Sequence, residues 1–282
     1  MEPGLYVVAT PIGNLRDITL RALDILAGAD LLLAEDTRVA RKLLDAYGIA
    51  ARPEAYHEHN AVAAGARALA ALGEGRAVAL VSDAGTPLVS DPGARLVRDA
   101  IAAGHRVIPI PGASAPLAAL AAAGLPAERF LFAGFPPPKS VARRRFFEEF
   151  AEAPATLAFF ETGPRLAESL ADMAAVLGDR EAVVGRELTK LFEEFRRGPL
   201  GELAKQYAVE PQPKGELVVM VAPPPEAVGM SEAEIEAGAA DLDLRAALKT
   251  LSVKEAAQQV AVLRDAPRRA LYRRALSLQA EA

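Results

Sequence analysis

The sequence predicts an α/β protein with two α/β domains and a small helical C-terminal appendage. In the first part of the chain, short apolar runs alternate with alanine- and leucine-rich stretches that end at glycine, which is typical of alternating strands and helices. Beyond residue 116 a second set of strand-like runs follows, and helix-like patterns follow the three prolines at 223–225. The expected domains are therefore residues 1–116, 117–225 and 226–282.

The first domain is expected to contain a mainly parallel sheet with helices on its faces, because strand and helix alternate along it. Its expected strands are residues 5–9, 30–34, 77–81 and 106–109. The intervening helices are expected at residues 19–28, 38–48, 61–73 and 94–104. Sheets of this kind bind ligands beyond the carboxyl ends of their strands.

The second domain and the tail have patterns of their own. Strands are expected at residues 130–134, 156–160, 181–186 and 216–221, with a shorter candidate at 192–197. Tail helices are expected at 242–248, 253–263 and 268–278, the middle one preceded by a capping box of Ser252 and Glu255.

Charge separates the tail from the body of the chain. From residue 241 onward, the chain has eight Lys or Arg and five Asp or Glu, a net charge of +3. Because the net charge of the whole chain is −5, the first 240 residues carry −8. A basic appendage on an acidic body is consistent with an anionic partner such as RNA, although an ordinary solvated helix face has the same composition.

Composition limits the classes of protein to which the chain can belong. The chain has no cysteine, which excludes disulfides and thiolate metal sites. No apolar stretch reaches the roughly 20 residues of a membrane span, so a soluble, cytoplasmic protein is expected. The histidines at 57 and 59 lack the spacing of an H-E-x-x-H zinc motif, and no metal site is expected.

Three loops rich in small and turn-forming residues follow expected strands of the first domain, at residues 10–15, 82–93 and 111–116. Their glycines and prolines force turns that leave backbone N–H and C=O groups unpaired at the strand ends. The G-x-G-x-x-G and G-x-x-x-x-G-K-[ST] fingerprints are missing, which disfavours dinucleotides and nucleoside triphosphates. Because the three loops are expected at neighbouring strand ends, they predict one pocket.

The order of the motifs resembles the tetrapyrrole methylase superfamily. The matching segments are residues 9–15, 34–38, 82–88, 111–115, Phe160-Glu161 with Arg165, and 214–216. The runs Thr-Pro-Ile-Gly-Asn and Ser-Asp-Ala-Gly-Thr-Pro depart from the Gly-x-Gly-x-Gly-Asp and Gly-Asp-Pro forms of tetrapyrrole-modifying members. That departure favours the RNA-modifying branch.

The resemblance implies an S-adenosylmethionine-dependent enzyme, acting as a homodimer, that methylates the 2′-oxygen of a cytidine ribose in the decoding region of small-subunit ribosomal RNA. It places the cofactor in the cleft between the two α/β domains. The residues expected to bind the cofactor are Pro11, Ser82, Asp83, Ala84, Gly85, Leu88, Ser114, Ala115, Phe160 and Lys214.

Two further sets of residues are candidates, one for catalysis and one for RNA binding. A ribose hydroxyl is a poor nucleophile, and the possible general bases at expected strand ends are Glu35, Asp36, His57 and Glu161, with none preferred. The expected RNA contacts are Lys139, Arg143, Arg144, Arg145, Arg196, Arg197, Arg268, Arg269, Arg273 and Arg274.

Two alternatives remain open. A tetrapyrrole-precursor methyltransferase would share the fold and cofactor but would need a broad pocket for a planar acidic ring and no basic tail. A non-catalytic assembly factor that binds ribosomal RNA would have lost its affinity for the cofactor.

Overall fold

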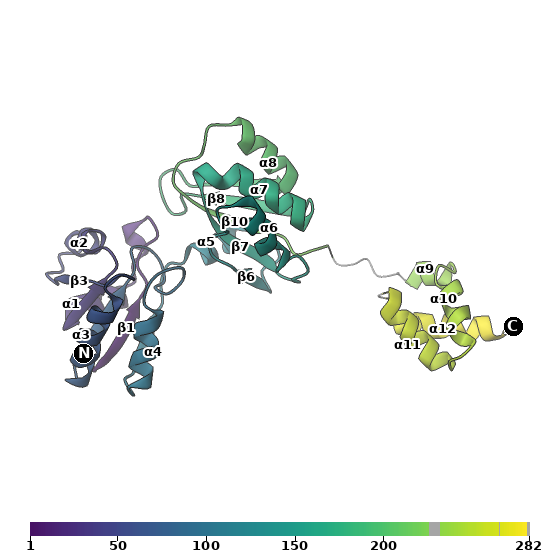
Figure 1. Ribbon diagram of the computed structural model, residues 1–282, viewed down its shortest axis with the longest axis horizontal. Helices are drawn as coiled ribbons and strands as arrows, with labels where there is room; N and C mark the ends of the chain where they lie inside the picture. Colours follow the sequence, from purple (N-terminus) through teal and green to yellow (C-terminus); the bar gives the residue numbers. More distant parts are fainter. Residues whose placement is uncertain (226–231, 265, 281–282) are drawn as a thin grey trace. The chain divides into compact units, whose positions relative to one another are not determined.

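The computed structural model describes residues 1–225, 232–264 and 266–280, so parts of the expected linker and tail at 226–231, 265 and 281–282 lie outside the described residues. The chain divides into two compact units, Met1–Ala222 and Pro223–Ala282. The first unit holds two five-stranded sheets, and the described part of the second is helical (Figure 1). Every helix and strand expected from the sequence is present, with each end within two residues of its expected place.

The first sheet is parallel throughout, in the order β3-β2-β4-β1-β5. Its strands are β1 (Gly4–Val8), β2 (Leu31–Ala34), β3 (Pro53–Ala55), β4 (Ala77–Val81) and β5 (Val107–Ile110). Strands β1 and β4 are buried along their whole length, because helices cover both faces. The short β3 was not expected, since Pro-Glu-Ala carries no apolar pattern.

Two pairs of helices cover the first sheet. Helices α1 (Leu20–Gly28) and α2 (Thr37–Ala46) pack on one face, where Leu26 and Leu44 contact the side chains of alternate strand residues. Helices α3 (Ala61–Gly73) and α4 (Ala94–Ala102) pack on the opposite face. A one-turn 3-10 helix, η1 (Leu15–Asp17), leads from β1 into α1.

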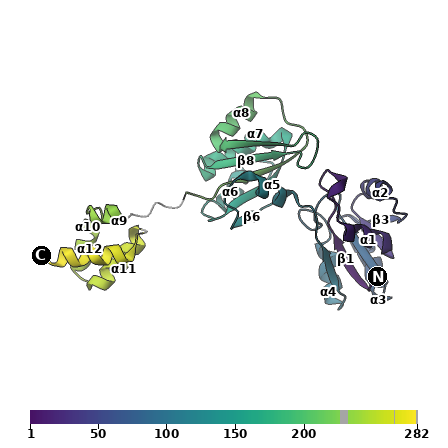
Figure 2. The ribbon, with the colours of Figure 1, turned by 180° about the vertical axis from the view of Figure 1, so that it is seen from behind.

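The second sheet is mixed, in the order β6-β7-β10-β8-β9, with a parallel β6–β7 pair and antiparallel pairs elsewhere. Its strands are β6 (Phe130–Phe132), β7 (Thr156–Thr162), β8 (Glu181–Arg186), β9 (Glu194–Pro199) and β10 (Glu216–Val221). Helices α6 (Ser140–Glu148), α7 (Gly163–Leu177) and α8 (Leu200–Val209) pack on one face of this sheet. Figure 2 shows α7 and α8 across the sheet from α5 (Ala115–Ala123).

Helix α5 joins the two sheets of the first unit. It follows β5 of the first sheet, but its Ala119 and Leu120 pack on Val183 and Met220 of the second. Ile12, from the loop after β1, belongs to the same apolar cluster. The expected domain boundary after residue 116 falls within this helix and stays a prediction.

The second unit is a small bundle with a core of its own. It comprises α9 (Glu232–Glu236), α10 (Asp241–Leu248), α11 (Val253–Arg264) and α12 (Arg268–Ala280). Leu244, Val260 and Leu271 are among its buried side chains. The capping box is confirmed: the Ser252 N–H donates to Glu255 Oε2 at 3.0 Å, and the Glu255 N–H donates to Ser252 Oγ at 3.4 Å.

Gly163 provides a test of packing around the second sheet. A Cβ atom at this first residue of α7 would collide with the carbonyl group of Pro213. Gly163→Ala should therefore lower the free energy of unfolding by about 1–3 kcal/mol in urea titrations, because the backbone must shift. In Gly65→Ala, a control within α3, the new Cβ meets nothing within 4 Å. This control should be neutral or more stable by up to about 1 kcal/mol; equal stability of the two variants would contradict the close approach.

Candidate functional site

Three loops meet at the carboxyl ends of the adjacent strands β4, β1 and β5. Thr10 and Gly85 exchange two backbone hydrogen bonds, with N···O distances of 2.8 and 3.0 Å. Thr10 Oγ1 donates to the Ser82 carbonyl at 3.2 Å, and Thr86 Oγ1 donates to the Ala113 carbonyl at 3.2 Å. The predicted convergence of the loops is confirmed.

Backbone geometry explains the small residues in these loops. Gly85 has a φ of +76°, a left-handed conformation that glycine adopts without strain. A Cβ on Gly112 would lie 2.9 Å from the Cβ of Ala9, so the loop after β5 can touch the loop after β1 only with glycine there. Leu88 and Ser90 also have positive φ values, 77° and 67°, which places local strain in the loop after β4.

A cavity of about 380 Å³, here called the acidic cavity, lies between these loops and the second sheet. Five carboxyl side chains line it: Glu35, Asp83, Asp91, Glu161 and Glu216. The apolar part of its wall includes Phe135, Phe160, Leu188 and Val218. Of the predicted cofactor residues, Asp83, Ala84, Gly85, Ser114, Ala115 and Phe160 line this cavity.

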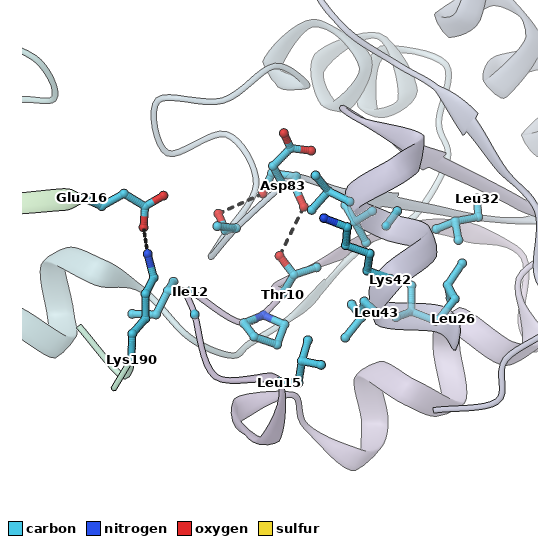
Figure 3. Close-up of a pocket in the computed structure, with 18 residues that line it drawn as sticks. Thr10, Ile12, Leu15, Leu26, Leu32, Lys42, Leu43, Asp83, Lys190 and Glu216 are labelled. Carbon is cyan, nitrogen blue, oxygen red and sulfur yellow. Dashed lines mark hydrogen bonds and ion pairs between the residues drawn. The ribbon is translucent and has the colours of Figure 1, made fainter. Parts of the chain in front are cut away.

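A second cavity of about 250 Å³, here called the apolar cavity, opens on the side of α1 and α2 (Figure 3). Leucine and valine side chains form much of its wall, together with Lys42 and Lys190. The predicted cofactor residues Pro11 and Ser82 line this cavity rather than the acidic one. Four residues line both cavities: Ile12, Asp83, Ala84 and Glu216.

Two predicted cofactor residues line neither cavity. Leu88 packs against the apolar core beneath the first sheet. Lys214 has an exposed side chain, and its carbonyl accepts a hydrogen bond from Arg186 at 3.4 Å. Both residues are close in sequence to the cavity lining, but their side chains do not contribute to it.

The carboxyl groups of the acidic cavity influence one another. Burial raises the pKa of Glu35, and the negative charges of Asp91 and Asp83 raise it further. Burial likewise raises the pKa of Asp91, although a hydrogen bond with Ser82 opposes this change. Glu35 therefore holds a proton more readily than an exposed glutamate does, and its carboxylate is a stronger base.

The other candidate bases have different surroundings. Hydrogen bonds from Arg38 lower the pKa of Asp36 to about 2, and Asp36 lines neither cavity. His57 lies outside both linings as well, and its Nδ1 has no partner among the described residues. Glu161 lines the acidic cavity and is 2% exposed. Its Oε1 accepts a hydrogen bond from the Thr162 N–H at 2.8 Å.

Glu161 and Phe160 are held in place by α7 and the loop after β6. Arg165, in the first turn of α7, lies 3.3 Å from Glu161 and donates to the carbonyl of Pro136. The Phe160 ring packs against those of Phe132 and Phe135, with centroids 4.8 and 5.2 Å apart. This contact network fixes one wall of the acidic cavity.

Several lining residues were not among the predicted site residues. Asp91 belongs to a second Ser-Asp pair in the same loop as Ser82 and Asp83, a repetition that could have indicated it. Glu216 and Leu188 lie far along the chain from the three loops and reach the site only through the second sheet. Glu216 belongs to the segment 214–216 that matches the superfamily pattern, whereas no local pattern in the sequence indicates Leu188.

Arg143 does not fit its predicted role as an RNA contact. Its side chain is 1% exposed, and it forms an ion pair with Asp172 at 2.7 Å. The same carboxylate accepts hydrogen bonds from Arg144 at 2.6 Å and from Ser140 at 3.0 Å. We therefore remove Arg143 from the candidate contacts, because it joins α6 to α7 inside the protein.

Two further predicted RNA contacts near the second sheet, Arg196 and Arg197, already have partners. Arg196 pairs with Glu194 and Glu210, and Arg197 donates to the carbonyls of Ala122 and Ala123 at the end of α5. By contrast, Lys139 and Arg145 are exposed, and neither forms an ion pair or side-chain hydrogen bond within the described parts of the chain.

The predicted cations of the tail also divide into two groups. Arg273 pairs with Glu232 at 2.9 Å, and Arg274 pairs with Asp241 and so joins α12 to α10. Arg268 and Arg269 are exposed, and the residues that the structure describes offer them no ion-pair partner. The first turn of α12 thus presents two arginines that have no ion-pair partner within the described part of the chain.

None of the described helices has the length and apolarity needed to cross a membrane. No group of three or more His, Cys, Asp or Glu among residues 1–225, 232–264 and 266–280 has a geometry that could hold a metal ion.

Comparison with known proteins identifies similar chains. Residues 234–279 match the family described as RsmI C-terminal HTH domain. A protein of Mesorhizobium japonicum named ribosomal RNA small subunit methyltransferase I is 55% identical, over 99% of this chain and 93% of its own length. A protein of Escherichia coli O157:H7 with the same name is 46% identical, over 98% of this chain and 95% of its own.

Solved structures share the fold of the first unit. Diphthine synthase matches with a TM-score of 0.58 and 18% identity, over 77% of this chain and 89% of that one. Uroporphyrin-III-C-methyltransferase from Thermus thermophilus matches with a TM-score of 0.54 and 24% identity, over 78% of this chain and 94% of that one. Residues 4–204 match the family described as Tetrapyrrole (Corrin/Porphyrin) Methylases. The chain therefore belongs to the tetrapyrrole methylase family and carries a C-terminal helical domain of the HTH type.

Proposed function

We propose that this chain transfers a methyl group from S-adenosylmethionine to the 2′-oxygen of a cytidine ribose in the decoding region of small-subunit ribosomal RNA. The observation that supports this most is the acidic cavity, where five carboxyl groups meet between the carboxyl ends of the parallel sheet and the second sheet. The substrate class follows from relatives that match over nearly the whole chain and are named for ribosomal RNA methylation. The resemblance further favours a cytoplasmic homodimer.

The lining of the acidic cavity fits this cofactor. A sulfonium carries a positive charge and no N–H or O–H donor, so carboxylates such as Asp83 and Asp91 attract it. The aromatic ring of Phe160 and the side chain of Leu188 offer an apolar surface to a purine. The volume of about 380 Å³ lies in the range of roughly 300–1,000 Å³ that is usual for small-molecule sites.

When bound, S-adenosylmethionine supplies a methyl group whose bond to sulfur breaks as the new bond to the acceptor oxygen forms, with the electron pair remaining on sulfur. Glu35 accepts the proton of the acceptor hydroxyl. Its raised pKa brings its basicity closer to the working pH, while the pKa of Asp36 near 2 makes that carboxylate a weak base. The partial burial of Glu35 also limits the water that competes for its proton.

Docking of the RNA depends on cations that have no partner within the protein. Lys139 and Arg145 on the second domain, and Arg268 and Arg269 on α12, meet this condition among the described residues. Phosphate contacts of this kind supply affinity without choosing a sequence. The choice of nucleotide is then made inside the first unit.

Asp83→Ala should weaken the binding of S-adenosylmethionine about tenfold or more, because a carboxylate of the acidic cavity is lost. Isothermal titration calorimetry measures the affinity. Asp45→Ala is the control, since Asp45 lies in α2 with a mostly exposed carboxylate outside both cavities. Equal affinity of Asp83→Ala and wild type would show that the cofactor binds elsewhere.

Glu35→Gln should lower kcat about 100-fold or more, because the amide cannot accept the hydroxyl proton. Since a carboxylate base acts only when ionised, wild-type activity should rise with pH through the pKa of Glu35. Asp91→Asn removes a negative charge that raises this pKa, so the rise should move to lower pH in that variant. A pH–rate profile that is the same in Asp91→Asn and wild type would argue against Glu35 as the base.

The double variant Arg268→Glu, Arg269→Glu reverses two exposed charges of α12. It should raise KM for small ribosomal subunits and leave the affinity for S-adenosylmethionine unchanged. The effect should shrink at high salt, where phosphate contacts contribute less. The control reverses Arg21 and Lys205, which are exposed and lie outside both cavities. If both double variants behave alike across salt concentrations, α12 does not contact the RNA.

Assays of the wild-type enzyme with labelled cofactor separate the alternatives. Methylation of a porphyrinoid but not of small subunits would support a tetrapyrrole-precursor methyltransferase. An absence of S-adenosylmethionine binding at millimolar concentration would support a non-catalytic assembly factor.

A further inference from the structure

We propose that the apolar cavity receives the acceptor nucleotide, with its base against the leucine side chains and its phosphate beside Lys42. The inference rests on the proposed methyl transfer and names the substrate site for it: a single unstacked ribonucleotide, separate from the cofactor in the acidic cavity. The two cavities would then hold the two reactants of one reaction.

The shared wall of the cavities brings such reactants together. Ile12, Asp83, Ala84 and Glu216 line both cavities, so an occupant of one cavity would contact the same residues as an occupant of the other. Methyl transfer requires the attacking oxygen to come within roughly 3–3.5 Å of the methyl carbon. A ribose at this boundary would direct its 2′-hydroxyl past Asp83 into the acidic cavity, where Glu35 lies.

The size and polarity of the apolar cavity favour a single nucleotide as its occupant. The apolar cavity measures about 250 Å³, too little for stacked or paired bases. Its interior is formed by Leu26, Leu32 and Leu43, with Leu15 at 44% exposure toward the solvent side. Enzymes that modify nucleotides take the target out of its stack into a pocket of this kind, at least cost where the target is already single-stranded.

Lys42 supplies the charge that an incoming phosphate needs. It is exposed on α2, lines the apolar cavity, and has no hydrogen bond or ion pair with any described residue. Figure 3 shows its side chain extending from the helix toward the loop that carries Asp83. A lysine without a carboxylate partner keeps its charge available for a phosphate.

Lys190 has a different role on the opposite side of the cavity. Its ammonium group lies 2.8 Å from Glu187 and 2.9 Å from Glu216, so its charge is already compensated. Its aliphatic stem lies on Gly13, where any Cβ would collide with it. This contact brings the turn between β8 and β9 onto the loop after β1 and closes that side of the cavity (Figure 3).

Two variants test the inference in the full-length protein. Val39→Trp places a large ring in the apolar cavity, since Val39 lines this cavity and not the acidic one. Lys42→Glu reverses the charge of a side chain that has no ion pair with any described residue. Both should bind S-adenosylmethionine within about twofold of wild type in calorimetry. Against small ribosomal subunits, kcat/KM should fall about 100-fold in Val39→Trp, and KM should rise about tenfold in Lys42→Glu.

Matched controls separate these effects from general damage. Val62→Trp adds the same ring at an exposed position of α3, and Lys205→Glu reverses an exposed charge on α8; neither residue lines a cavity. Both controls should retain wild-type kinetics. If Val39→Trp does not fold, the KM of Lys42→Glu decides the question.

The outcomes also separate this inference from the proposed function. Wild-type KM and kcat in Lys42→Glu and Val39→Trp would overturn the acceptor site while methyl transfer itself stands. Loss of S-adenosylmethionine binding in folded Val39→Trp would assign the apolar cavity to the cofactor and overturn the inference as well. A wild-type enzyme that binds S-adenosylmethionine but does not methylate small subunits would overturn the proposed function instead.

Discussion

The site depends on the short loop that follows β1, because this loop is bonded to one sheet and packed on the other. Thr10 forms two backbone hydrogen bonds with Gly85, which fixes the loop to the end of β4. Two residues later, Ile12 packs in the apolar cluster beneath the second sheet. The main-chain hydrogen bonds orient this loop at the first sheet, and the burial of Ile12 stabilises its contact with the second sheet. Together these interactions link the two sheets. Both cavities share Ile12 as a lining residue, and a displacement of this loop would alter both at once.

A surplus of carboxyl groups distinguishes the acidic cavity from the apolar cavity. Burial raises the pKa values of Glu35 and Asp91, and the negative charges of neighbouring carboxylates raise them further, whereas Glu161 and Glu216 are paired with Arg165 and Lys190. A cationic ligand would relieve the repulsion among these groups, so the same arrangement favours a sulfonium over a neutral thioether. This preference would help a methyl donor enter and its neutral product leave. The wall of the neighbouring apolar cavity is mostly apolar, and its polar part includes two lysines, Thr10, Ser82 and the shared acidic residues, which suits a base and a phosphate.

The arginine-rich segments show why clusters of charge in a sequence predict contacts poorly. Arg143, Arg144 and Arg145 are consecutive in the sequence, yet helical geometry points them in different directions. Arg143 enters the interior and pairs with Asp172, while Arg145 remains exposed. The same division separates Arg274, which joins two helices of the tail, from Arg268 and Arg269. Carboxylate partners that lie far away in the sequence decide which cations are available for phosphate.

From the sequence alone, local patterns determined every strand except β3, helices α1 to α4 and α10 to α12, and the order of the three loops. Apolar periodicity, glycine helix ends and turn residues act over a few neighbours, which is why these elements could be predicted. The loop composition also determined most of the acidic cavity's lining on the first sheet, including Asp83 and Gly85. Only the tertiary structure decided which distant groups complete the site: Leu188 and Glu216 arrive on the second sheet, and α5 joins that sheet although it follows the first in the chain. It also decided that two cavities share one wall and that Glu35 is partly buried beside Asp83 and Asp91, which raises its pKa. Burial and the proximity of charges depend on how separate segments pack, and no local pattern of residues records them.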